Sequence, residues 1–144
     1  MENMMRKIVV LTLSFVCVAP VVALAQEYNC SAQTLNGEYI FAGRGFIEPG
    51  EPGVQRVRSG VLIFDGAGNV AGKQSSSRGG NISRDRLQGT YALDANCSGT
   101  ATFGSVAKPG SQIHWDLYVA RGGKTGHMVR MDDGSMAVRT FQKE

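Results

Sequence analysis

Apolar and polar residues alternate along most of the chain after residue 30, with the two-residue period that places successive side chains on opposite faces of a β-strand. The clearest case is the segment 113–119, where apolar residues alternate strictly with His114, Asp116 and Tyr118. Turn signals rich in Gly, Pro and Asn separate these segments. Beyond a short turn at 31–35, no segment has a helical period. The pattern predicts eight strands, at residues 37–47, 54–65, 70–77, 82–93, 99–106, 113–119, 126–131 and 136–141.

Short hairpin links connect these predicted strands. Residues 65–69 (Asp-Gly-Ala-Gly-Asn) make one tight turn, and Asp133-Gly134 as a two-residue turn would pair Val129 with Val138 and His127 with Thr140. A bulge is expected near Gly89. Without helices to cover them, antiparallel strands must bury their apolar faces against one another. The short links favour an all-β, up-and-down meander that forms a closed or partly closed β-barrel, with a β-sandwich as the alternative.

Alternation and hairpin register together predict which side chains face the barrel interior. The inward set is Tyr39, Phe41, Leu62, Phe64, Tyr91, Phe103, Trp115, Leu117, Val129, Met131 and Val138. The same register turns His127 inward, where a histidine is more often a hydrogen-bonded core residue than a ligand. A barrel of this size is just wide enough to be filled by side chains or to hold one small ligand. The candidate ligand-binding residues are therefore Tyr39, Phe41, Phe64, Tyr91, Phe103, Trp115, His127 and Met131.

The N-terminal segment has the features of a secretory signal peptide. Arg6 and Lys7 precede the apolar run 8–19, which ends at Pro20, and small residues follow at 23–25 (Ala-Leu-Ala). The competing interpretation is a membrane anchor, because residues 8–25 are just long enough to span a bilayer. We expect cleavage after Ala25, export to the periplasm or the extracellular space, and a single domain over residues 26–144 with no transmembrane segment.

Two cysteines, Cys30 and Cys97, remain after removal of the predicted signal peptide, since Cys17 lies within it. An even pair in an exported chain indicates a disulfide. Two free thiols or a metal pair are the alternatives. The only histidines, His114 and His127, show no zinc-type spacing with either cysteine. We expect no metal and no cofactor.

The formal charge is +3 over 144 residues, from 15 Lys and Arg against 12 Asp and Glu. This excess is too small to indicate nucleic acid as a partner. The pairs Arg56/Arg58 and Arg84/Arg86, with Arg78, lie in the second to fourth predicted strands, and each pair points to one face. We interpret them as a solvated outer face. The alternative is contact with an anionic envelope surface, such as lipid head groups or a polyanionic polysaccharide.

Four sequence motifs carry a family resemblance: Cys30-Ser31 with TLNGEY at 34–39 and Phe41, FDGAGN at 64–69, GTY at 89–91, and CSGTATF at 97–103. Together they resemble a group of small, uncharacterised secreted bacterial proteins. The two cysteines lie where that group keeps its pair, which also implies a disulfide. The resemblance implies no activity. The GEY sequence at 37–39 also resembles the opening of calycin barrels such as lipocalins, with Tyr39 in place of their Trp, and implies a calycin-like barrel.

His114, Asp116 and Tyr118 share one strand face and are the candidates for acid–base chemistry. No nucleophile motif accompanies them, so a solvated polar face is favoured. Residues 65–69 and 132–135 are too short for a calcium loop of the EF-hand type and are interpreted as turns. We therefore expect no enzyme, with a cyclase or isomerase as the minor alternative.

The leading hypothesis is an exported barrel that binds a small apolar ligand. The second is an envelope-associated structural or interaction module without a ligand. Oligomeric state does not follow from the sequence.

Overall fold

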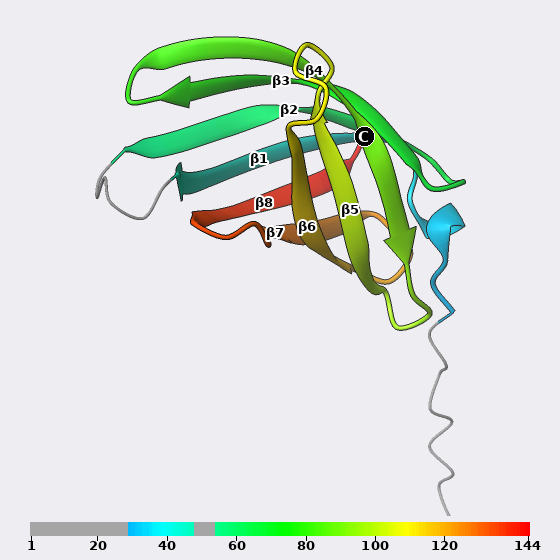
Figure 1. The fold of residues 1–144 in the computed structure, drawn as a ribbon. Helices are drawn as coiled ribbons and strands as arrows, with labels where there is room; N and C mark the ends of the chain where they lie inside the picture. Colours follow the sequence, from blue (N-terminus) through cyan, green and yellow to red (C-terminus); the bar gives the residue numbers. More distant parts are fainter. Residues whose placement is uncertain (1–28, 48–53) are drawn as a thin grey trace, which may run out of the picture.

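The computed structural model describes residues 29–47 and 54–144 as one closed barrel of eight antiparallel strands (Figure 1). Each strand pairs with the next in sequence, and β8 pairs with β1 to close the barrel. A short 3-10 helix, η1 (Ala32–Thr34), precedes the first strand. The strands are β1 (Asn36–Ile47), β2 (Gln55–Asp65), β3 (Asn69–Arg78), β4 (Asn81–Leu93), β5 (Ser98–Ser105), β6 (Gln112–Val119), β7 (Thr125–Arg130) and β8 (Ser135–Lys143).

This architecture confirms the predicted up-and-down barrel and excludes the sandwich. Every strand boundary lies within two residues of its predicted position. The bulge expected near Gly89 is wrong, because Gly89 pairs with Val70 and with Phe103 in uninterrupted ladders. The glycine is needed there for space: a Cβ at this position would overlap the Cβ of Phe103. The predicted signal peptide and its cleavage site lie outside the described residues.

The turn between β2 and β3 is built around the Asp65 carboxylate. Its oxygens accept hydrogen bonds from the backbone N–H of Ala67 (2.7 Å) and Asn69 (2.9 Å) and from the Asn69 side chain (2.6 Å). These bonds, led by that of the Asn69 side chain, lower the pKa of Asp65. Gly66 and Gly68 adopt positive φ angles of 74° and 103°, as the tight reversal requires. Residues 65–69 thus form a hairpin turn, as predicted, and the Asp65 carboxylate stabilises it.

One end of the barrel is filled by aromatic side chains. Phe64 makes edge-to-face contacts with Tyr39 and Tyr91, at centroid distances of 5.4 and 4.9 Å. The segment that includes η1 covers this end (Figure 1), with Leu35 fully buried. The Tyr91 hydroxyl donates to the carbonyl oxygens of Ala32 (2.7 Å) and Leu35 (2.8 Å). This closed end is therefore a packed apolar core whose polar atoms are satisfied.

A disulfide joins Cys30 to Cys97 and excludes both the free-thiol and the metal-pair interpretation in this structure. Cys97 lies in the β4–β5 turn, so the bond ties the segment before η1 to the same closed end. The backbone N–H of Cys30 donates to the carbonyl of Ala95 (3.1 Å), which adds a second link between the two segments.

The predicted orientation of the last hairpin is wrong. Its register is as expected, since Val129 pairs with Val138 and His127 with Thr140. However, Val129, Met131 and Val138 are 40 %, 54 % and 43 % exposed, and His127 is exposed as well. Facing residues of a hairpin share a side of the sheet, but register alone does not say which side. The opposite side, which bears Met128, Arg139 and Phe141, is the one that faces inward.

We expect loss of the Cys30–Cys97 bond to lower the free energy of unfolding by about 4 kcal/mol, because the bond closes a loop of 67 residues. Denaturant unfolding of the mature domain with and without reductant measures this difference. The C30S/C97S variant is the control and must match the reduced protein and ignore the reductant. Equal midpoints for the oxidised and reduced protein would show that the bond does not constrain the unfolded chain.

Candidate anion-binding site

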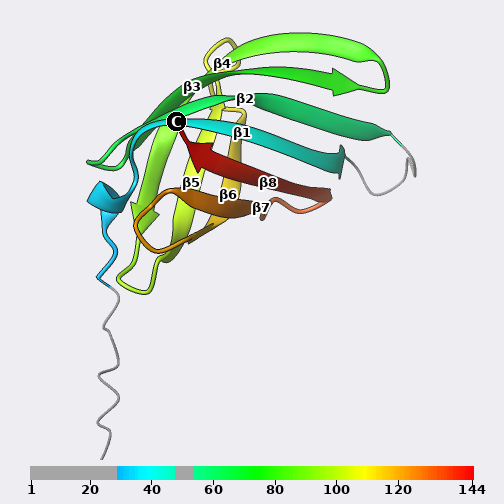
Figure 2. The same cartoon turned by 180° about the vertical axis from the view of Figure 1, so that it is seen from behind.

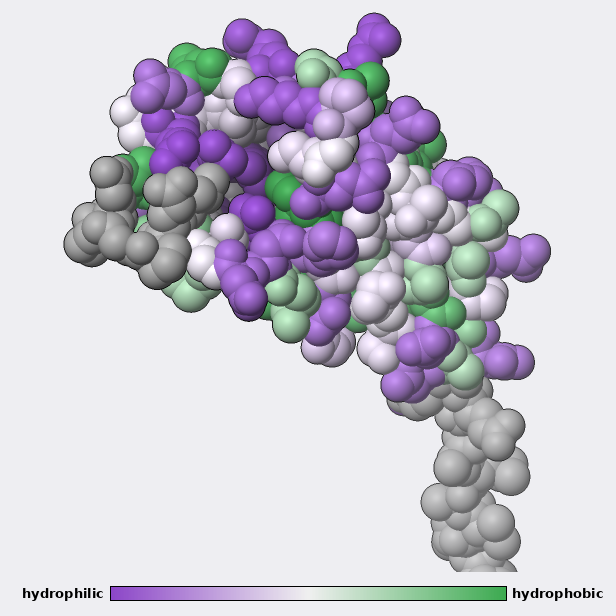
Figure 3. Space-filling model, viewed as in Figure 1, coloured by the Kyte–Doolittle hydropathy of each residue, from purple (hydrophilic) through white to green (hydrophobic). Residues whose placement is uncertain are grey.

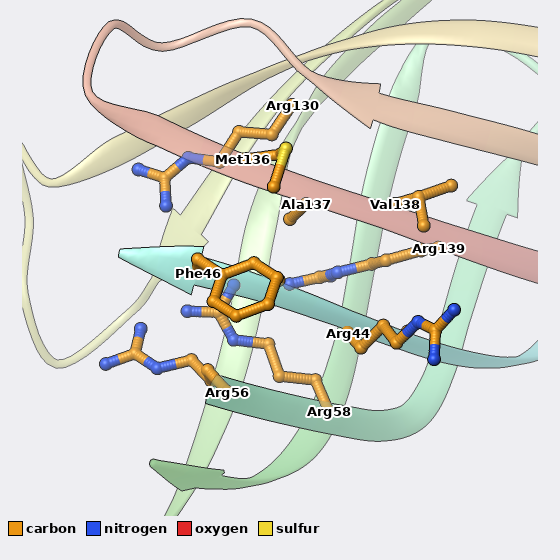
Figure 4. Close-up of a pocket in the computed structure, with 11 residues that line it drawn as sticks. Arg44, Phe46, Arg56, Arg58, Arg130, Met136, Ala137, Val138 and Arg139 are labelled. Carbon is orange, nitrogen blue, oxygen red and sulfur yellow. The ribbon is translucent and has the colours of Figure 1, made fainter. Parts of the chain in front are cut away.

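The other end of the barrel is open and bears arginines instead of apolar side chains. Strands β1 to β4 are 10–13 residues long and β5 to β8 only 6–9, so the long strands project beyond the rest (Figures 1 and 2). Five arginines line a pocket there: Arg44 from β1, Arg56 and Arg58 from β2, Arg130 from β7 and Arg139 from β8 (Figure 4). Arg44 is exposed, and the other four are at least half-buried. Hydrophilic side chains also gather at this end in the space-filling view (Figure 3).

Two glycines of β1 make room for these arginines. Gly43 pairs with Arg58 on one side and with Arg139 on the other, and Gly45 lies between Arg56 and Ala137. A Cβ at Gly43 would overlap the Cγ of Arg139. Because β1 presents no side chain at either position, the guanidinium groups of the flanking strands can extend across the lumen.

Arg139 is the central residue of the site and is only 2 % exposed. Its guanidinium carbon lies 4.4 Å from the ring centroid of Trp115, 4.9 Å from that of Phe41 and 5.6 Å from that of Phe103. Such contacts stabilise a cation, by about 2 kcal/mol or more where water is excluded. Its Nη2 donates to the side-chain oxygen of Gln74 (3.3 Å), whereas its Nη1 has no partner.

Burial and mutual repulsion make the cluster electrostatically unfavourable. Burial first, and then the charges of Arg58, Arg130 and Arg56, lower the pKa of Arg139 well below its ordinary value. Burial, followed by Arg56 and Arg130, lowers the pKa of Arg58 to about 10. In residues 29–47 and 54–144, no salt bridge joins Arg56, Arg58 or Arg139 to a carboxylate. An anion in the pocket would relieve this repulsion.

Among the described residues, Asp85 and Asp132 are the acids that act on this cluster, and both already accept hydrogen bonds. Asp85 accepts from the hydroxyls of Ser83 (3.3 Å) and Ser105 (3.1 Å). Asp132 accepts from Arg130 Nε (2.8 Å) and lies 2.7 Å from Nδ1 of His114. Partial burial raises the pKa of Asp132, but the hydrogen bonds from His114 and Arg130 outweigh it, so the pKa lies below its usual value. Arg130 thus has a carboxylate partner. Within the described residues Arg56 and Arg58 have only the partial effect of Asp85, and no carboxylate pairs with Arg139.

Among the residues that the structure describes, the buried side-chain atoms left without a partner are all hydrogen-bond donors. They are Nε of Arg56, Nε of Arg58, Nη1 of Arg139 and Nε1 of Trp115. Unpaired buried donors are rare and costly in folded proteins. The cavity between the arginines has a volume of about 10 Å³, room for about one water molecule. A ligand larger than a water molecule therefore requires side chains that line the cavity to move. The three arginines with unpaired donors line this cavity, and an oxyanion supplies the several oxygen acceptors that such donors require.

The structure separates the residues predicted to bind a ligand into three places. Tyr39, Phe64 and Tyr91 belong to the closed-end core. Phe41, Phe103 and Trp115 surround Arg139, where Phe103 and Trp115 stack at 5.9 Å. His127 and Met131 lie on the outer surface, away from both.

Sequence reasoning placed Arg56 and Arg58 on the outer face and did not single out Arg130 or Arg139. This was wrong, and the alternation itself carried the signal. Arg56 and Arg58 have the same parity as the inward Leu62 and Phe64. Arg84 and Arg86 do lie on the exposed face, as expected, and Arg78 is half-buried.

The candidate acid–base residues of β6, for which a solvated polar face was favoured, are not brought together by the structure. His114 contacts Asp132 of the β7–β8 turn, not Asp116 of its own strand. Tyr118 is exposed. Among the described residues there is also no group of three or more His, Cys, Asp or Glu side chains arranged to hold a metal ion.

Comparisons with protein-family models, with curated proteins and with solved structures found no match to this chain. Within residues 29–47 and 54–144, no helix has the length and apolarity needed to cross a bilayer. Because no similar protein indicates a function, the evidence for function is the geometry of the arginine cluster itself.

Substitutions at Arg139 distinguish a functional from a structural arginine. We expect Arg139→Met to unfold at equal or higher denaturant concentration than wild type, because it replaces an uncompensated buried cation by an apolar chain of similar length. Arg139→Ala should cost about 2–4 kcal/mol through the cavity it leaves. Chemical unfolding followed by Trp115 fluorescence measures both. A loss of several kcal/mol in Arg139→Met would show that the cation itself holds the barrel together.

Proposed function

We propose that this protein is a non-enzymatic binding protein that captures a small oxyanion, free or as the carboxylate or phosphate group of a small molecule, at the open end of its barrel. The observation that carries the proposal is the guanidinium of Arg139, which lines the cavity, is buried without a carboxylate partner among the described residues and retains an unpaired donor. Retention of an uncompensated buried charge is costly and is expected where the charge meets a ligand.

The arrangement of the donors supports an oxygen-rich ligand. Arginine forks match the planar geometry of carboxylates and phosphates and bind them through paired hydrogen bonds. Arg58 and Arg139 approach from opposite sides of Gly43, so their guanidinium groups can contact one anion together.

A purely apolar ligand, the hypothesis favoured by the sequence, is the second candidate. The aromatic residues proposed to line its site are in contact with one another or with Arg139. Such a ligand would have to replace the Tyr39–Phe64–Tyr91 ring contacts and would leave the arginines unpaired. The charged ligand is therefore the better fit.

We expect phosphate, sulfate or acetate to raise the melting temperature of the wild-type domain at constant ionic strength, relative to chloride. At about a hundredfold excess over the dissociation constant, binding stabilises by about 2.7 kcal/mol. Phosphate and sulfate also stabilise proteins by exclusion from their surface, so the difference between variants is decisive. Arg139→Met and Arg58→Met should lose the specific increment, while Arg84→Met, which removes an exposed arginine outside the lumen, keeps it. Equal increments in wild type and Arg139→Met would refute an anion site.

We also propose that the chain is exported with removal of residues 1–25, which the disulfide supports because such bonds persist in oxidising compartments. Expression of the full chain in a bacterium should yield a product that begins at Gln26 and has lost two protons to the disulfide. Intact mass spectrometry with and without reduction measures both. A product that retains residues 1–25 would contradict export by cleavage.

A further inference from the structure

A strip of exposed apolar side chains crosses the outer face of β8, β1, β2 and β4 near the open end. It consists of Phe46, Val57, Ile82, Met136 and Val138, which are between 39 % and 70 % exposed. We call this set the outer apolar strip. The register makes it continuous: Met136 pairs with Phe46, while Arg44 lies between Val138 and Val57. Ser77 then connects Val57 to Ile82. Figure 2 shows strands β8, β1, β2 and β3 side by side on this face.

Basic residues accompany the strip toward the open end, whereas the exposed acids on the same face of β1 and β2, Glu38 and Asp65, lie toward the closed end. Arg44, Lys73, Arg84 and Arg86 are exposed, and Lys73 pairs directly with Arg86. Over residues 40–46, 55–64, 69–77, 82–93 and 136–143, the one acid is Asp85. Asp85 is half-buried and bonded to Ser83 and Ser105. Among the described residues, this face therefore combines apolar contact area with an excess of positive charge toward the open end.

A shallow open groove runs between the side chains of this face. It has a volume of about 670 Å³ and is lined by Ala42, Val57, Ile82 and Val138, with Arg44 at its side. Its floor is formed by the small side chains of Ser59, Ser75 and Ser77. The surface beside the outer apolar strip is thus a depression with Arg44 at its side, and it is not flat.

We propose that this face docks on an anionic lipid bilayer. Contiguous exposed apolar residues on a small protein mark an interaction site. A bilayer surface supplies both an apolar region for the strip and dispersed negative charge for the four basic residues. A polyanionic polysaccharide or nucleic acid offers the charge without a comparable apolar partner. A second copy of this chain docked through the same face would bring basic residues against basic residues.

Flotation with lipid vesicles tests the proposal. The mature domain should bind vesicles of phosphatidylcholine containing about a third of phosphatidylglycerol, and not vesicles of phosphatidylcholine alone. Each basic residue near an anionic surface contributes about fivefold to binding, so R84Q/R86Q should bind about 25-fold more weakly. Binding should also fall as salt is raised. I82S and V57S should weaken binding at every salt concentration, since they remove apolar contact area.

K108Q/K124Q is the matched control, because it removes the same charge from exposed turn residues outside this face. It should bind like wild type. Arg139→Met should also bind vesicles normally, so failure of the luminal anion site and failure of the docking face are separable. Absence of binding to the anionic vesicles would overturn the proposal, as would equal losses in R84Q/R86Q and K108Q/K124Q. Retention on heparin without vesicle binding would overturn it in favour of a soluble polyanion.

Discussion

The pairing of β8 with β1 is the constraint on which the rest of the structure depends. Once this ladder closes the sheet, each side chain of the eight strands must point either into a lumen of fixed width or out to the surface. The closed end uses the lumen for a core of Tyr39, Phe64 and Tyr91. The open end, enclosed by the same ladders, uses it for arginines. Closure of the barrel therefore brings together guanidinium groups, and on an open sheet these groups would be free to move apart.

Confinement explains why the arginine cluster is costly and how the barrel tolerates it. Trp115, Phe41 and Phe103 surround the guanidinium of Arg139, and Gln74 accepts one of its hydrogen bonds. These contacts replace part of its hydration, but they supply no counter-charge. The stability of the closed end, with its ring contacts and disulfide, allows the open end to retain this unfavourable charge. The two halves of the lumen thus have complementary roles, one stabilising and one available for a ligand.

The strands and their order could be predicted because a period of two and glycine-rich turns are local signals. The β2–β3 turn, for example, is closed by Asp65 through bonds within five consecutive residues. Which face of a strand points into the barrel was predictable where one face is clearly more apolar than the other, as in β6 with Trp115 and Leu117. It failed in β7 and β8, where both faces carry apolar residues: Val129 competes with Met128, and Val138 with Phe141. Only packing against the rest of the barrel decides between them.

The candidate site was missed for a different reason. In β2 the two-residue period places Arg56 and Arg58 on the inward face, but the general expectation that arginines are exposed to solvent was given more weight. Arg56 and Arg58 have the parity of Leu62, while Val57 lies between them on the opposite face. The same strand thus supplies both the luminal anion site and the outer apolar strip. A register shift of one residue would exchange these faces completely. The exact pairing of β1 with β2, in which inward Gly43 and Gly45 face the two arginines, therefore fixes both surfaces at once. A charged residue within an apolar alternation is evidence for a buried functional group when its parity is that of the core.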